Sequence, residues 1–181
     1  FSIEWSRIEP EEGIFNGKEM QHYIDVVKAL MDRGIEPMIT LWHFTNPVWF
    51  SQKGGFINID SPKYFTRYVK YVVEHLKHQV GLWITFNEAT TIYAAFTKLN
   101  AMWPSRSRGL ISFMITRRNI VKAHIEAYKE IKKLYDQSPV DLKSAEAESQ
   151  RFSEVQPRES NTSHNVRVGI TENNVYVPDT N

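Results

Sequence analysis

Cysteine is absent from this chain of 181 residues. The absence excludes disulfide bonds and metal sites built on thiolates, and it is compatible with the cytoplasmic location that we expect. No uninterrupted apolar run approaches the roughly 20 residues that a membrane-spanning helix needs. Residues 1–5 also lack the basic start and apolar centre of a signal peptide. They are typical of the middle of a strand, so we expect the chain to be part of a longer protein.

An excess of charge of one sign is also absent, because 22 Lys and Arg residues against 21 Asp and Glu residues give a net charge of +1. Nucleic acids and anionic membranes attract basic surfaces, so neither is expected as a partner. His75 and His78 are one helical turn apart, but no further ligand residue accompanies them. We therefore expect no metal at this pair. The sequence leaves the oligomeric state open.

Apolar residues recur at helical spacing in the stretches 18–33, 61–76 and 110–135, which predicts three long helices. Gly34 is suited to end the first helix in the left-handed conformation. Ser61 and Pro62 predict the start of the second, with a hydroxyl cap followed by proline in the first turn. The core-facing positions predicted for the second helix are Phe65, Tyr68, Val69, Val72, Val73 and Leu76. Those predicted for the third are Phe113, Met114, Ile120, Val121, His124, Ile125, Tyr128 and Ile131.

Short apolar runs at 1–5, 37–44, 82–87 and 166–170 predict strands between these helices. Alternating strands and helices indicate an α/β fold with a parallel sheet, here a partial (β/α)8 TIM barrel. A complete barrel needs about 250 residues, and this chain has no room for the other four units. The polar stretch at 137–165 is interpreted as a mobile insertion within a single domain that spans residues 1–181.

The run LWITF at 82–86 leads directly into Asn87 and Glu88. In a barrel, residues at the carboxyl end of a strand form the active face, so these two side chains are candidates for chemistry. His43 follows the preceding strand in the same way. Ordinary structural roles are the alternatives: Glu88 could favour a helix N-terminus, and His43 could be a buried histidine bonded to the backbone.

Several motifs occur in the order seen in family 1 glycoside hydrolases, the β-glucosidases and β-galactosidases. They are FSIEWSRIEP at 1–10, TLWHFTNP at 40–47, TFNE at 85–88, the pair Trp103-Pro104, and AHIEAY at 123–128. The resemblance extends from residue 1 to about residue 136 and resumes at Val168. Two positions depart from the family's usual pattern. Ala89 stands where proline is usual, and Phe44 where many members have tryptophan.

The resemblance implies a (β/α)8 barrel that hydrolyses β-linked glycosides with retention and without a cofactor. Glu88 matches the family's general acid/base, Asn87 the residue that binds the sugar's 2-hydroxyl, and His43 a histidine that hydrogen-bonds the sugar. The implied substrates are β-linked glucosides or galactosides, either oligosaccharides or aryl and alkyl glycosides. An aromatic rim would suit the apolar faces of sugar rings. The candidates for this rim are Trp42, Trp49 and Trp103, each of which could instead belong to the core.

Glu172 lies in a Thr-Glu-Asn sequence that imitates the family's nucleophile motif, but Asn174 replaces the glycine of that motif. One long helix and one polar stretch separate Glu88 from Glu172, which is too little chain for two further strand and helix units. We interpret Glu172 as part of the fifth strand, so the nucleophile is expected to be missing from this chain. Three alternatives stay open: a non-catalytic sugar-binding remnant, a truncated inactive product, and an unrelated barrel hydrolase acting on polysaccharide.

Overall fold

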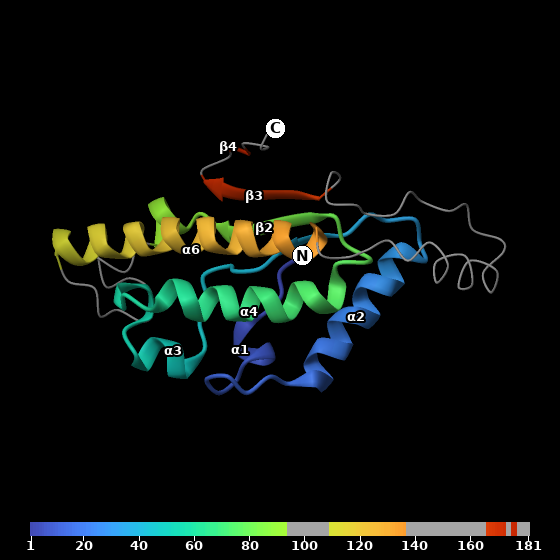
Figure 1. The fold of residues 1–181 in the computed structure, drawn as a ribbon, viewed down its shortest axis with the longest axis horizontal. Helices are drawn as coiled ribbons and strands as arrows, with labels where there is room; N and C mark the ends of the chain where they lie inside the picture. The colour runs from blue at the N-terminus through green and yellow to red at the C-terminus, as the bar shows by residue number, and fades with distance from the viewer. Residues whose placement is uncertain (94–108, 137–165, 173–174, 177–181) are drawn as a thin grey trace.

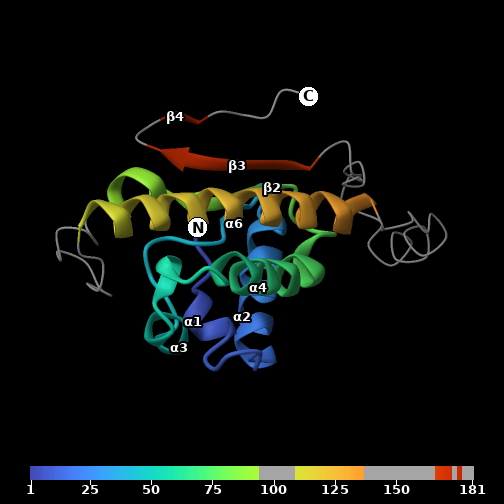
Figure 2. The same ribbon diagram turned by 60° about the vertical axis from the view of Figure 1, so that its left-hand side comes forward.

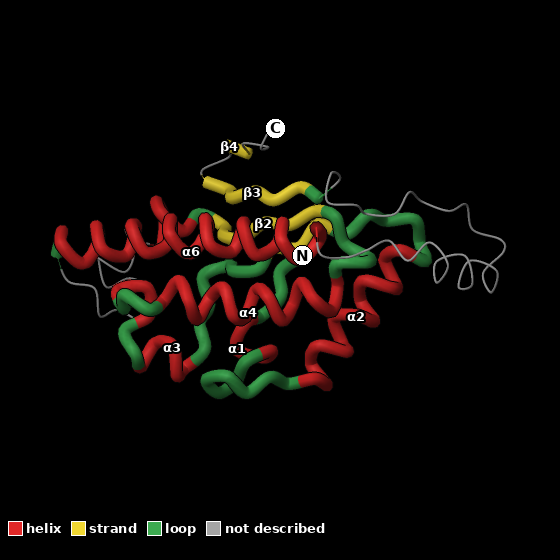
Figure 3. Tube along the Cα trace, in the orientation of Figure 1, coloured by secondary structure: helices red, strands yellow, loops and turns green. Residues whose placement is uncertain are grey.

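Strands and helices alternate along the computed structural model, which describes residues 1–93, 109–136, 166–172 and 175–176. The helices are α1 (Trp5–Ile8), α2 (Gly17–Met31), α3 (Val48–Gln52), η1 (Gly55–Ile57), α4 (Ser61–Leu76), η2 (Ala89–Tyr93) and α6 (Leu110–Asp136). The strands are β1 (Met38–Thr40), β2 (Leu82–Asn87), β3 (Arg167–Glu172) and β4 (Val175–Tyr176). Figure 3 shows how the two kinds of element follow one another along the trace.

The sheet has the order β1-β2-β3-β4, and its first three strands are parallel, which confirms the predicted parallel α/β arrangement. Strand β4 adds an antiparallel edge that the sequence did not predict. The N-terminal segment was predicted to be a strand as far as Trp5. It contributes only a parallel bridge from Ser2 to Thr40, because the helix α1 already begins at Trp5.

An irregularity interrupts the pairing of β2 with β3. Ile84 pairs with Gly169 and Asn87 with Thr171, so three steps along β2 correspond to two along β3. An extra residue of this kind is a β-bulge, which bends the strand and changes the direction of the side chains that follow it. The bulge lies immediately before Asn87 and Glu88.

Helices α4 and α6 lie side by side (Figures 1 and 2). All six positions predicted to face the core from α4 are buried. The predicted hydroxyl cap is wrong, because Asp60 is the N-cap residue and the Oγ of Ser61 is buried without a hydrogen-bond partner among the described residues. Gly34 has a φ of 73°, as expected for a residue just after a helix.

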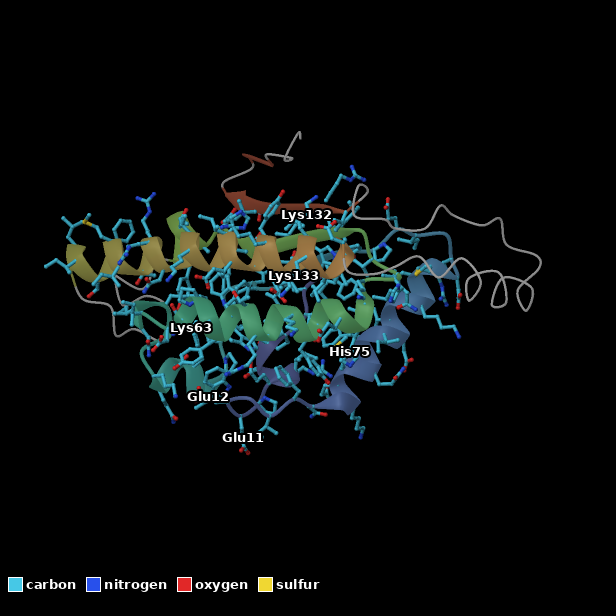
Figure 4. All side chains as sticks on the ribbon, in the orientation of Figure 1. Glu11, Glu12, Lys63, His75, Lys132 and Lys133 are labelled. Carbon is cyan, nitrogen blue, oxygen red and sulfur yellow. The ribbon has the colours of Figure 1, made fainter. Side chains whose placement is uncertain are left out.

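The inward face predicted for α6 is partly wrong. Ile120 and Ile131 are buried, but Met114, Val121 and Ile125 are exposed. The other buried positions of α6 are Thr116, Asn119, Ala123, Ala127, Leu134 and Tyr135. At the other side of α6, Lys132 extends toward β3 and its Nζ donates to the carbonyl of Val166 at 3.0 Å (Figure 4). The polar stretch 137–165 lies outside the described residues.

Candidate active site

Two residues other than glycine have a positive φ among the described residues, and both lie just after parallel strands. Phe44 follows β1 with a φ of 72°, and Glu88 follows β2 with a φ of 46°. Residues other than glycine adopt a positive φ at a cost in free energy, so this conformation persists only where the surrounding structure holds it. Such residues are enriched at functional sites. The carboxyl edge of β1 and β2 is therefore the first candidate for a site.

Backbone hydrogen bonds hold this edge together across three segments. The N–H of Asn87 donates to the carbonyl of Trp42 at 3.0 Å, and the N–H of Glu88 donates to the carbonyl of Thr171 at 2.6 Å. His43 comes directly after Trp42, and Glu88 comes directly after Asn87. Their loops consequently begin one strand spacing apart, about 5 Å. The structure thus brings together three of the residues that the sequence singled out.

Glu88 and Asn87 both have partly exposed side chains. The hydroxyl of Thr171 donates to Oδ1 of Asn87 at 2.8 Å. Glu88 is also tied through its main chain to η2, because its carbonyl accepts the N–H of Tyr93 at 3.2 Å. A carboxyl group and an amide beside one another at an accessible strand end can exchange a proton with a ligand and bind its hydroxyl groups.

His43 is exposed, and its Nδ1 lies 3.1 Å from the hydroxyl of Ser2. It is therefore not a buried histidine bonded to the backbone. The ring of Phe44 packs against the imidazole with centroids 5.0 Å apart. Ser2 is held in place by its bridge to Thr40, so the N-terminal segment positions one nitrogen of His43.

Trp42 differs from the expected sugar platform because its ring is only 1% exposed. Its Nε1 donates to Oδ1 of Asn46 at 3.0 Å, and Nδ2 of Asn46 donates to the hydroxyl of Tyr93 at 3.1 Å. Burial raises the pKa of Tyr93 to about 12 although the bond from Asn46 lowers it, so this phenol stays neutral. The expected open ring face is not observed, and Trp42 instead belongs to the core and bonds Asn46.

Trp49 is half-buried on α3 and packs against Trp5 and Tyr64 with centroids 5.9 and 5.6 Å apart. Its Nε1 donates to the carbonyl of Glu9 at 2.9 Å. Part of the ring surface stays accessible, so its role toward a sugar stays a prediction. Trp103 lies outside the described residues.

Glu9 is a buried acid that sequence reasoning missed. Its carboxylate is fully buried and accepts hydrogen bonds from Nε1 of Trp5 at 2.9 Å, from the N–H of Gly13 at 2.8 Å, and from Arg67. This ion pair joins α4 to the loop after α1. Glu9 and Arg67 are too far apart in the sequence for helical periodicity or strand alternation to link them. No sequence signal therefore indicated the contact.

Polar contacts of Ser2, Glu4 and Thr171 with the site were also missed. The carboxylate of Glu4 accepts hydrogen bonds from Ser6 at 2.9 Å and from Thr45 at 2.8 Å, beside His43. Glu4 occurs in the strand-like alternation of residues 1–5, which could have indicated that its side chain shares a face with Ser2. No group of three His, Cys, Asp or Glu side chains that could hold a metal occurs in the described part of the chain. Nor is any helix there long and apolar enough to cross a membrane.

Comparisons with known proteins identify the relatives of this chain. A 6-phospho-β-galactosidase of Clostridium acetobutylicum is 31% identical over 134 residues, which are 72% of this chain and 28% of that protein. A cytosolic β-glucosidase of Cavia porcellus is 28% identical over 75% of this chain and 29% of its own length. The chain thus spans less than a third of the curated relatives that it matches.

Solved structures agree with these relatives. A β-glucosidase from Thermotoga maritima in complex with cyclophellitol superimposes with a TM-score of 0.76 at 25% identity, covering 96% of this chain and 34% of that chain. A β-glycosidase from Pyrococcus horikoshii gives a TM-score of 0.69 at 36% identity, covering 84% and 39%. The predicted fold is confirmed: the strands and helices are part of a TIM barrel that is not closed. The model of glycosyl hydrolase family 1 matches residues 1–176, and the chain belongs to that family.

Proposed function

We propose that the protein hydrolyses β-glycosidic bonds by a retaining double displacement in which Glu88 is the general acid and then the general base. The observation that carries this proposal is the hydrogen bond from the N–H of Asn87 to the carbonyl of Trp42, which joins the two segments that carry Glu88 and His43. In the first step Glu88 protonates the departing oxygen. In the second step it removes a proton from the attacking water.

Asn87 and His43 bind the sugar in this proposal. The NH₂ group of Asn87 donates to the 2-hydroxyl, whose hydrogen bond strengthens as the transition state develops. His43 presents the ring nitrogen that does not contact Ser2 to another hydroxyl group of the same sugar. Trp49 and Trp103 are proposed to contact the apolar faces of sugar rings, while Trp42 acts only by holding Asn46.

A retaining mechanism also needs a nucleophilic carboxylate about 5 to 5.5 Å from the acid. Glu172 belongs to β3, which pairs directly with β2, so its strand is the next one in the barrel after that of Glu88. This adjacency supports the interpretation of Glu172 as a fifth-strand residue. We propose that the nucleophile belongs to a later strand, which this chain of 181 residues does not supply.

The proposed substrates are β-linked glucosides and galactosides, as oligosaccharides or as aryl and alkyl glycosides. Relatives named β-glucosidase and 6-phospho-β-galactosidase support this class. A relative named cytosolic β-glucosidase supports a cytoplasmic location for this protein as well.

The test uses the product of the complete reading frame that encodes these residues. Hydrolysis of 4-nitrophenyl β-glucoside and β-galactoside is measured for the wild type, for Glu88→Gln, and for Glu74→Gln as a control. Glu74 is an acid on α4 whose side chain is 43% exposed. We expect kcat to fall by about 10² to 10⁴ in Glu88→Gln and to stay unchanged in the control. Equal hydrolysis by wild type and Glu88→Gln would contradict the assignment.

Binding separates this proposal from the alternative of a non-catalytic sugar-binding protein. Tryptophan fluorescence of the same product is followed during titration with cellobiose. Saturable quenching without hydrolysis of either aryl glycoside would favour the binding protein. Hydrolysis that depends on Glu88 supports the enzyme.

A further inference from the structure

Thr171 contacts Asn87 through its side chain and Glu88 through its main chain. Its Oγ1 lies 2.8 Å from Oδ1 of Asn87, and its carbonyl accepts the N–H of Glu88 at 2.6 Å. An amide oxygen can only accept a hydrogen bond, so the hydroxyl of Thr171 is the donor. The orientation of the Asn87 amide is thereby fixed, and its Nδ2 is the group left for a ligand.

The bulge in β2 makes this double contact available. Because Asn87 rather than Phe86 pairs with Thr171, the side chains of Asn87 and Thr171 come from directly opposed positions. Opposed side chains on neighbouring strands are the pairs that contact one another most closely. The carbonyl of Thr171 also accepts the N–H of Glu88, one residue beyond the paired Asn87. This hydrogen bond helps to hold the backbone of Glu88 at its φ of 46°.

We propose that Thr171 is a positioning residue that holds the Asn87 amide with its NH₂ group toward the substrate's 2-hydroxyl while its carbonyl holds the backbone of Glu88. This inference rests on the proposed function, which gives Asn87 its contact with the 2-hydroxyl. Thr171 touches no reacting atom. Its effect on the reaction passes through the hydrogen bond to Oδ1.

A competing arrangement exists for the same hydroxyl. The carbonyl of Phe86 lies 3.5 Å from Oγ1 of Thr171, at the outer limit for a hydrogen bond. If the single hydroxyl proton went to Phe86, the amide would be free to turn and its NH₂ would face Thr171. The contact of 2.8 Å favours Asn87 as the acceptor.

Kinetics of the complete reading-frame product test the inference. Thr171→Val removes the hydroxyl while keeping a β-branched side chain of similar shape, and Thr171→Ser keeps the hydroxyl. The control is Thr116→Val, because the Oγ1 of Thr116 is buried without a hydrogen-bond partner among the described residues. Each protein is assayed on 4-nitrophenyl β-glucoside and on its 2-deoxy counterpart.

We expect Thr171→Val to lower kcat/KM on the glucoside by about tenfold, the effect of one hydrogen bond, and to leave the 2-deoxy substrate unaffected. Thr171→Ser and Thr116→Val should stay within about twofold of wild type on both substrates. Equal losses on the two substrates, or no loss on either, would overturn the inference. A loss in Thr171→Ser equal to that in Thr171→Val would do so as well.

Nuclear magnetic resonance separates failure of this inference from failure of the proposed function. If the wild type hydrolyses neither substrate, the proposed function fails, and the hydrogen bond from Thr171 to Asn87 is then tested in the same reading-frame product. The ¹⁵N order parameter of the Asn87 side-chain amide should fall in Thr171→Val and be retained in Thr171→Ser. An order parameter that is the same in wild type and Thr171→Val would refute the positioning role of Thr171.

Discussion

Replacing Arg67 with methionine should destabilise the protein far more than removing a surface charge. The carboxylate of Glu9 is 0% exposed, and Arg67 is its charged partner. Without Arg67 the carboxylate keeps its hydrogen bonds from Trp5 and Gly13 but has no counter-charge. Breaking a buried pair from one side costs about 3–5 kcal/mol. The side chain of Arg67 is 35% exposed, so water can reach part of the gap and we expect the lower end, about 3 kcal/mol.

Urea denaturation followed by tryptophan fluorescence measures this change, because Trp5 contacts Glu9 directly. A loss of about 3 kcal/mol in a chain of this size corresponds to a decrease in Tm of roughly 6–12 °C. The matched control is Lys63→Met, which removes the surface pair with Asp60 at the start of α4, where Lys63 is 76% exposed (Figure 4). The control should change the free energy of unfolding by no more than about 0.5 kcal/mol.

The double variant Glu9→Gln with Arg67→Met completes the test. Because the neutral amide needs no counter-charge, the double variant should be more stable than Arg67→Met alone. The reasoning is refuted if Arg67→Met costs no more than Lys63→Met. It is refuted equally if the double variant is as unstable as the sum of its single changes.

Three further predictions concern the packing of α6 and the strained strand end. Asn119→Ala should cost about 1–3 kcal/mol in urea denaturation, because Nδ2 of the buried Asn119 donates to the carbonyl of Phe56 at 2.9 Å; a cost below about 0.5 kcal/mol would contradict this. Burial raises the pKa of Tyr135 to about 12 although the bond from Trp83 lowers it. The native state therefore keeps a proton that the unfolded chain loses near pH 10, and stability present below pH 10 is lost as the pH rises to 12. Tyr135→Phe should flatten that decline in pH-dependent unfolding, and parallel curves would count against it. Glu88→Gly should be about 1 kcal/mol more stable than Glu88→Ala in thermal unfolding, since glycine tolerates a φ of 46°; equal midpoints would show that the backbone is not strained there.

The sequence predicted the buried face of α4, although not its N-cap, because one helical stripe of apolar residues marks that face. Its neighbour α6 shows where such a stripe misleads. Met114, Val121 and Ile125 also recur at helical spacing, but the buried face includes Ala123 and Ala127, whose small side chains give a weak apolar signal. Hydrophobic periodicity identifies a helix reliably, whereas tertiary packing decides which face is buried.

The candidate site was predicted as far as single strand ends could show it. Asn87, Glu88 and His43 each follow an apolar run, and parallel strands bring such ends to one edge. The contacts that hold them were not predictable in the same way. The bond of Thr171 to Asn87 depends on a bulge, and that of Ser2 to His43 depends on a bridge between distant segments. A pattern within one strand carries no record of its register with another strand.

Because β2 has one extra residue opposite β3, the number of residues in this strand matters as much as their identity. Deleting one residue between Ile84 and Asn87 would restore regular pairing with β3. The same deletion would leave Asn87 opposite Thr171 but would remove the extra residue that bends β2 and sets the direction in which Glu88 leaves the strand. Any substitution at 85 or 86 leaves this count intact. We therefore expect a change in length here to abolish the site even where every neighbouring side chain is preserved.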